Sequence, residues 1–191
     1  MKIALSAAVL TLVAGAAFAA PVTYDIDPNH TYPSFEADHM GGLSVWRGKL
    51  DKTSGTIVLD TDKGTGTVEI TVDTGSIDFG QEKLNEHAQG PDLFDVAKYP
   101  TATYKGKLVN FKNGAPTEVQ GEFTLHGVTK PLTLTINQFL CKLEPMRKKE
   151  VCGADASATF NRKDYGMSFG EAYGFKMGVK LAIQVEAVRQ S

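Results

Sequence analysis

The chain has 191 residues, with 20 Lys and Arg against 22 Asp and Glu, and a formal net charge of -2. This balance excludes a nucleic-acid protein that binds through many phosphate contacts. Hydrophobic residues make up 42% and charged residues 22%, which excludes a disordered chain, and only two cysteines exclude a disulfide-dense scaffold. The length predicts one domain.

The first segment has the pattern of a secretory signal. Lys2 precedes an uncharged apolar run over residues 3–18, which ends in Ala17-Phe18-Ala19, with small residues at the two positions read by a signal peptidase. The run is short for a bilayer span, which needs about 20 residues, and no basic stop-transfer cluster follows it. We therefore predict a signal peptide over residues 1–19, cleaved after Ala19, and a mature domain over residues 20–191 with no stable membrane span.

The mature chain reads as strands, because apolar and polar residues alternate with a period of two. The clearest runs lie at residues 68–72, 119–125, 132–136 and 175–187, with weaker ones at 57–59 and 156–160. Turn sequences with glycine separate these runs at residues 63–66, 112–114 and 126–131. Only residues 81–96 look helical, and Gly90-Pro91 interrupts them.

Such regular spacing favours an all-β sandwich or barrel. About eight antiparallel strands, each with one apolar face, can close into a barrel that leaves no exposed edge. The interior of a barrel of that size is either filled by side chains or holds one small ligand. The strand pattern leaves both interiors open.

The predicted export bears on the state of the two cysteines, because disulfides persist in oxidising compartments. Cys141 and Cys152 predict a structural disulfide in an exported protein. Closing this short loop would stabilise the fold by roughly 2–3 kcal/mol. The alternative is a redox or metal site, but C-x-x-C is absent and two thiols alone cannot complete a tetrahedral zinc site. The role of the basic loop that they bracket stays open.

Residues 166–170 match the G-x-S-x-G pattern of a hydrolase nucleophile. All four histidines precede Ser168 and no helical pattern follows it, so the pattern lacks the context that such a nucleophile needs. His30, His39, His87 and His126 have no metal-ligand spacing. We expect each of them to bond a backbone carbonyl or a carboxylate near a loop. The sequence therefore predicts no catalytic residue and no metal site.

Several blocks of sequence carry a resemblance to a known family. They are residues 24–31 followed by Phe35 and His39, residues 75–77 followed by His87, residues 92–100, residues 119–131 and residues 161–167. In this order the blocks resemble the YceI-like family over nearly the whole mature chain. The chain departs from the family pattern at Ala88, where many members have leucine, and in the Cys141–Cys152 excursion.

The resemblance implies a lipocalin-like antiparallel β-barrel, exported to the bacterial periplasm. It implies an apolar tunnel that holds a long isoprenoid lipid, either a prenyl quinone such as ubiquinone or a polyprenyl phosphate, for transport or storage. It implies no catalysis and no cofactor besides the bound lipid. One alternative is a filled barrel that acts as a stress-related scaffold or interaction protein. An enzyme that acts on the bound lipid is less favoured. The sequence leaves the oligomeric state open, including a homodimer.

Alternation along the strands, together with the resemblance, predicts the ligand-binding residues. The side chains expected inside the tunnel are Phe35, Ala37, Trp46, Tyr104, Phe123, Leu125, Leu134, Phe160, Met177 and Leu181. Leu93, Phe94 and Tyr99 are expected to close one end, and His39, His87 and Arg162 to stand at the mouth. For each residue the alternative is ordinary core packing.

The apolar tail and the polar head group of such a ligand contribute differently to binding. Each buried CH₂ contributes about 0.8 kcal/mol, so one five-carbon isoprene unit gains on the order of 3–4 kcal/mol. We therefore expect burial of the tail to supply affinity, and a few polar groups at the mouth to select the head group.

Overall fold

The computed structural model describes residues 20–190, so the predicted signal peptide lies outside the described residues. The strands are β1 (Val22–Ile26), β2 (Tyr32–His39), β3 (Ser44–Leu50), β4 (Thr53–Asp60), β5 (Thr65–Asp73), β6 (Ile77–Asp78), β7 (Thr101–Val109), β8 (Glu118–Leu125), β9 (Val128–Glu144), β10 (Lys149–Asn161) and β11 (Gly178–Arg189). The helices are α1 (Glu82–Gln89) and three 3₁₀ turns, η1 (Thr74–Ser76), η2 (Arg162–Tyr165) and η3 (Glu171–Tyr173).

Eight of the strands form a closed antiparallel barrel. Their order is β1-β4-β5-β7-β8-β9-β10-β11, and β11 pairs back with β1. At this seam Tyr24 lies opposite Arg189, and Ile26 lies opposite Ala187. The predicted all-β barrel of about eight strands with one short helical segment is confirmed.

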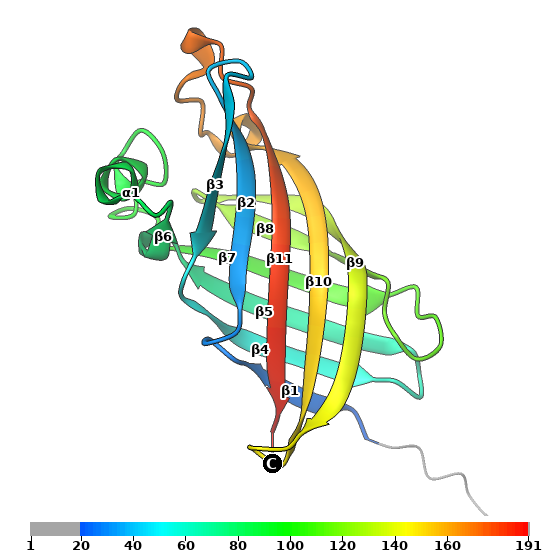
Figure 1. The fold of residues 1–191 in the computed structure, drawn as a ribbon. Coiled ribbons are helices and arrows are strands. Elements are labelled where there is room, and N and C mark those ends of the chain that lie inside the picture. Colours follow the sequence, from blue (N-terminus) through cyan, green and yellow to red (C-terminus); the bar gives the residue numbers. More distant parts are fainter. Residues whose placement is uncertain (1–19, 191) are drawn as a thin grey trace, which may run out of the picture.

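One end of the barrel is extended by a flap, which consists of β2, β3 and β6. β11 is longer than β1, and its residues 179–184 pair with β2 instead. β2 pairs in turn with β3, and β3 with β6, where the sheet ends. The β2–β3 hairpin therefore rises beside the upper half of β11, while β1 and the β9–β10 hairpin lie at the lower end (Figure 1). Helix α1 stands beside β6, at the free edge of this flap (Figure 1).

Helix α1 is shorter than the helical segment that the sequence predicts. The side chain of Gln81 caps its first turn by accepting a hydrogen bond from the amide of Leu84. The helix ends at Gln89 with Gly90 as its C-cap, and Pro91 has no amide hydrogen to continue it. The chain then folds back, and the amide of Phe94 donates to the carbonyl of Ala88. This return brings residues 93–94 against the barrel.

A bulge in β9 changes which residues face the interior. Ile136 lies opposite Ala156, but Gln138 lies opposite Asp155, so the pairing with β10 gains one extra residue on β9. An extra residue shifts the alternation by one position. Ile136 and Phe139 therefore both face the interior, although three positions separate them.

Within residues 20–190, none of the helices has the length and apolar character needed to cross a bilayer.

Candidate functional site

The interior of the barrel contains a cavity of about 440 Å³. Its wall runs from Ile57 and Val185 in the lower half of the barrel to Trp46 and Phe175 at the upper end. The volume is in the range of known small-molecule sites, and the wall is built mainly from aliphatic and aromatic side chains. The cavity is therefore the candidate functional site.

The burial of the inward side chains shows that they do not meet in the middle. Phe35, Phe123 and Leu181 point inward from the centres of their strands, yet each is only partly buried. Tyr24 and Tyr165, which do not line the cavity, are by contrast only 3% and 2% exposed. In a filled core, which packs as densely as an organic crystal, the inward aliphatic and aromatic groups would be buried to a similar extent. The interior is hollow.

Two polar groups of the wall are engaged by the backbone, whereas the buried hydroxyl of Thr53, which also lines the cavity, has no hydrogen-bond partner among the described residues. The Tyr104 hydroxyl lies 3.0 Å from the carbonyl oxygen of Val119 and 2.8 Å from that of Leu132. Burial raises the pKa of Tyr104, so the phenol stays neutral. The Thr31 hydroxyl donates to the carbonyl of Glu186 and accepts from its amide. The tunnel therefore presents mainly carbon to a ligand.

The ring of Tyr104 packs against one of two facing glycines, Gly121. Gly106 and Gly121 lie opposite each other on β7 and β8. A Cβ atom on Gly121 would lie 2.9 Å from the ring carbon Cζ of Tyr104 and 2.8 Å from the Cα atom of Gly106. Gly121 therefore leaves room for the tyrosine ring, and Gly106 lets β7 and β8 approach each other, since its Cβ atom would lie 3.0 Å from the carbonyl oxygen of Gln120.

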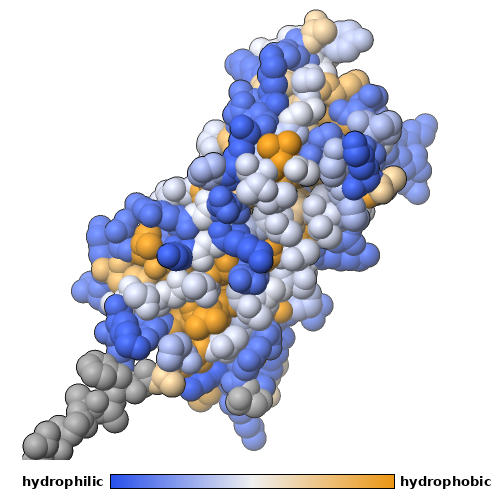
Figure 2. Space-filling model, turned by 180° about the vertical axis from the view of Figure 1, so that it is seen from behind, coloured by the Kyte–Doolittle hydropathy of each residue, from blue (hydrophilic) through white to orange (hydrophobic). Residues whose placement is uncertain are grey.

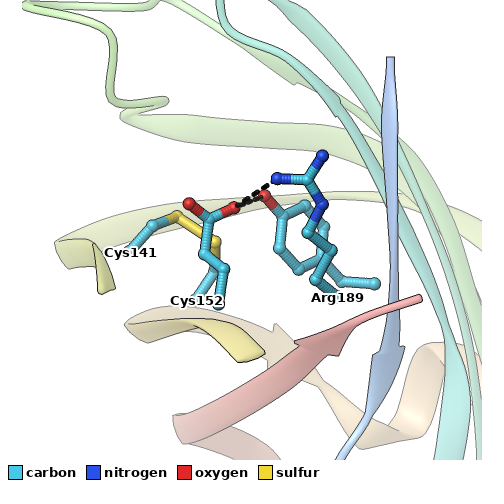
Figure 3. The surroundings of a disulfide bond; sticks show 5 residues. Cys141, Cys152 and Arg189 are labelled. Carbon is cyan, nitrogen blue, oxygen red and sulfur yellow. Dashed lines mark hydrogen bonds and ion pairs between the residues drawn. A yellow bond between two sulfur atoms is a disulfide. The ribbon is translucent and has the colours of Figure 1, made fainter. Parts of the chain in front are cut away.

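The lower end of the barrel is filled by a disulfide and a polar triplet. Cys141 and Cys152 are bonded, with an S–S distance of 2.01 Å, as the sequence predicts. Beside them the Tyr24 hydroxyl donates to Glu150 at 2.5 Å, and Arg189 lies 3.8 Å from the same carboxylate (Figure 3). Burial and the bond to Glu150 raise the pKa of Tyr24 to about 12. We call these five residues the floor.

The basic loop between the cysteines is tied to the barrel. Arg147 places Nη1 2.7 Å from Oδ2 of buried Asp27, which also lies 2.8 Å from Nδ1 of His30. Burial acts to raise the pKa of Asp27, but the bonds from His30 and Arg147 outweigh it and hold the pKa below its usual value. Asp27, His30 and Glu186 are close enough to share a metal ion, yet the adjacent guanidinium would repel one.

We call the upper end of the cavity the mouth. Three segments surround it. They are residues 39–46 between β2 and β3, residues 79–94 around α1, and residues 162–175 after β10. His39 stacks on Trp46 with ring centres 4.1 Å apart and meets the edge of Phe175 at 5.1 Å. His87 meets Phe169 at 5.1 Å. Aromatic pairs thus hold the rim together on two sides.

Arg162 organises one segment of the mouth. Its Nη1 donates to the carbonyl of Met167 at 2.9 Å, and its Nη2 donates to that of Phe169 at 2.6 Å. Burial lowers the pKa of Arg162, against the opposing charge of Glu171. Arg162 lines the cavity as predicted, but part of its donor capacity is used to fold the loop over residues 167–169.

Most of the predicted ligand-binding residues line the cavity. They are Phe35, Ala37, His39, Trp46, His87, Leu93, Phe94, Tyr104, Phe123, Leu125, Leu134, Phe160, Arg162 and Leu181. Their contact with a ligand stays a prediction.

Two predicted residues, Tyr99 and Met177, do not line the cavity. The ring of Tyr99 instead packs on His126, at 4.2 Å, and lies over Gly127. Met177 precedes the first residue of β11, which begins at Gly178 and not at Phe175 as the alternation predicts. The strand alternation therefore does not govern Met177.

Part of the wall comes from residues that strand alternation does not predict. Phe139 was hidden by the bulge, and Phe79 and Phe169 lie outside strands, where alternation gives no signal. Ile183 and Val185 lie on the apolar face that the alternation over residues 175–187 predicts, and Ala154 continues the alternation of residues 156–160 towards the floor; all three line the cavity.

The remaining sequence motifs have structural roles. His30 bonds the carboxylate of Asp27, and Nδ1 of His126 lies 3.2 Å from the carbonyl of Tyr165, as the sequence predicts. The prediction is wrong for His39, whose Nδ1 lies 3.4 Å from the hydroxyl of Ser44. Ser168 lies in an exposed turn between η2 and η3, which is not the strand-to-helix turn of a hydrolase nucleophile.

Comparison with known proteins now adds the family. The model of the YceI-like domain matches residues 24–188. The chain belongs to the YceI-like family. It is 31% identical to the UPF0312 protein of Pseudomonas aeruginosa over 98% of this chain and 96% of that protein. It is also 31% identical to Protein YceI of Escherichia coli O157:H7, over 97% of this chain and 96% of the relative.

Solved structures of other YceI-type barrels share the fold. BcnA of Burkholderia cenocepacia matches with a TM-score of 0.67 and 21% identity, over 85% of this chain and 99% of that one. A polyisoprenoid-binding domain from Saccharophagus degradans matches with a TM-score of 0.63 and 16% identity, over 87% of this chain and 98% of that domain. At these identities the likeness establishes the fold of this YceI-like chain.

Proposed function

We propose that this YceI-like protein is a non-catalytic binding protein that holds a long-chain isoprenoid lipid in its tunnel for transport or storage. The observation that carries the proposal is the hollow interior, whose inward side chains keep exposed surface and present mainly carbon. The polyisoprenoid-binding domain from Saccharophagus degradans, which has the same fold, supports the lipid class.

The shape of the wall suits a chain that enters tail first. The floor fills the lower end, and the polar groups that remain accessible, such as His39 and His87, lie at the mouth. Burial of the tail supplies affinity at about 0.8 kcal/mol for each CH₂. A quinone or phosphate head would then rest among the rim residues, where hydrogen-bond donors are available.

We further propose that the protein acts in the periplasm after removal of residues 1–19. The three-part pattern of that segment supports export. The Cys141–Cys152 disulfide also supports it, because such bonds persist in oxidising compartments. A lipid that is almost insoluble in water needs a protein with an apolar cavity to carry it through the aqueous periplasm.

Filling the tunnel tests the proposal. Ala154 lines the cavity on β10, whereas Ala182 is exposed on the outer face of the neighbouring β11. We expect Ala154→Phe to lower the uptake of a fluorescent prenyl quinone analogue at least tenfold, and Ala182→Phe to leave uptake unchanged. Equal uptake by a folded Ala154→Phe variant would place the ligand outside the tunnel.

A further inference from the structure

Two neighbouring loops at the mouth expose large apolar side chains to solvent. The loop between β2 and β3 carries Met40 and Leu43, which are 52% and 74% exposed, and η3 carries Tyr173, which is 72% exposed. The loops touch, since a Cβ atom on Gly41 would lie 3.1 Å from the carbonyl oxygen of Gly174. Both stand together at the upper end of the molecule (Figure 1). We call residues 40–45 and 172–175 the mouth tips.

The mouth tips carry no charged residue. The nearest carboxylates are engaged: Asp38 accepts from the amides of Gly41 and Lys176, and Glu171 pairs with Lys163 at 2.6 Å. The ammonium group of Lys176 lies close to the first tip, 3.8 Å from a Cβ atom on Gly42, and Oδ1 of Asp38 lies 4.0 Å from the same position. An apolar tip with a cation behind it complements the apolar interior and anionic head groups of a bilayer.

The apolar surface of the mouth tips continues into the tunnel. Met40 follows His39 and Val45 precedes Trp46, while Phe175 closes the second tip. His39, Trp46 and Phe175 all line the cavity. Seen from behind, the surface is mostly hydrophilic, with apolar patches at the upper end and in the lower half (Figure 2). The wall of the tunnel therefore reaches the surface at the mouth tips.

Local folding does not explain the methionine in the first tip. Met40 has φ +49°, in the left-handed region that glycine and asparagine adopt at least cost. Its side chain is nevertheless apolar and half exposed. A turn selected only for stability and solubility would carry asparagine or glycine at this position.

We propose that the mouth tips dock into the surface of a phospholipid bilayer, so that the tunnel opens towards the membrane. Leu43 and Met40 enter the apolar layer, and Tyr173 lies at the head-group level, where its ring and hydroxyl find apolar and polar surroundings. An isoprenoid tail then passes between bilayer and tunnel without crossing water. This proposal rests on the proposed lipid-binding function, because it assigns the membrane as the partner of the same tunnel.

A pair of double variants tests the docking. Met40→Asn with Leu43→Ser removes apolar surface from the first tip, and asparagine suits the left-handed position. Leu143→Ser with Met146→Asn is the matched control on the β9–β10 hairpin at the opposite end, where these side chains are 68% and 90% exposed. Sedimentation with vesicles of phosphatidylcholine and phosphatidylglycerol measures binding. Trp46 is the only tryptophan and lines the mouth, so lipids brominated along the acyl chain report its depth by quenching.

We expect the parent to sediment with the vesicles and its Trp46 fluorescence to be quenched. The tip variant should bind about tenfold more weakly, and the hairpin variant should bind like the parent. Three results overturn the docking: no binding by the parent, equal binding by the tip variant, or a loss confined to the hairpin variant. Uptake of a prenyl quinone from detergent, without vesicles, tests the tunnel separately. If the parent takes up no quinone, the lipid-binding function fails, whatever the vesicles show.

Discussion

Arg147 and Asp27 join the disulfide loop to the base of the barrel. Nη1 of Arg147 lies 2.7 Å from Oδ2 of Asp27, and the carboxylate also accepts a hydrogen bond from the amide of Asn29. The side chain of Asp27 is almost fully buried, whereas Arg147 reaches solvent. The basic loop therefore has a second tie besides the disulfide, which gives it a structural role beside the floor.

Acid should weaken this tie. The folded-state pKa of Asp27 is lowered, so the stability it contributes is complete above its unfolded pKa of about 3.9 and is lost as the pH falls through the folded value. Asp27→Asn should cost about 2 kcal/mol at pH 7. The stability gap between parent and variant, measured by urea unfolding, should stay constant above pH 5 and narrow towards pH 3. A constant gap down to pH 3 would contradict the assignment.

Removal of the disulfide should loosen the floor. Replacing Cys141 and Cys152 by serine frees a loop with a sequence separation of 11, which costs roughly 2–3 kcal/mol of unfolding free energy. Because the bond lies beside the Tyr24–Glu150–Arg189 triplet at the end of the tunnel, a preloaded quinone should also be released faster. Denaturant titration and fluorescence release measure the two effects. Release at the parent rate would show that the disulfide does not help to seal the tunnel.

The facing glycines give a packing test. A Cβ atom on Gly121 would lie 2.4 Å from the carbonyl oxygen of Lys105, a contact that neither strand can relieve without moving. Gly121→Ala should therefore cost about 2 kcal/mol or more, because overpacking shifts the backbone and the Tyr104 ring. Gly178→Ala is the control, since that Cβ atom would meet nothing within 4 Å. Thermal melting compares them, and equal melting temperatures would refute the packing account.

Arg162 should control the order of the mouth. Arg162→Lys keeps the charge but cannot donate to both Met167 and Phe169, so one buried carbonyl loses its partner at a cost of about 1–3 kcal/mol. Lys163→Gln is the neighbouring control, because its exposed pair with Glu171 contributes about 1 kcal/mol or less. Hydrogen exchange of the amides in residues 167–175 should accelerate only in the first variant. Similar exchange in both would assign the ordering of the loop to other contacts.

Much of the barrel could be predicted from the sequence because every second residue of a half-buried strand is apolar and faces the interior. Phe123 and Leu125 on β8, and Leu181 on β11, were placed on the inner face by this rule, and all three line the cavity. The disulfide could be predicted because the pattern of residues 1–19 predicts an oxidising compartment, and two cysteines allow one pairing. The hollow interior could not, since the same residue types build a filled core and a tunnel wall.

The errors of the sequence interpretation lie where the strand geometry is interrupted. The extra residue between Ile136 and Gln138 reverses the alternation of β9. Phe139 therefore lines the cavity although the alternation did not predict it. Tyr99 follows the helix in an irregular segment, where no periodicity tells which way a ring points. The split pairing of β11, first with β2 and then with β1, depends on contacts between segments far apart in the chain. Local pattern carries no signal for such pairing.

The measurement that tests the central claim most directly is mass spectrometry of the lipid that co-purifies with the protein from its native host. We predict that an organic extract of the folded protein yields one long isoprenoid at close to one molecule per chain, and that the Ala154→Phe variant yields almost none. A parent protein that arrives empty, and that also takes up no added prenyl quinone, would contradict the account.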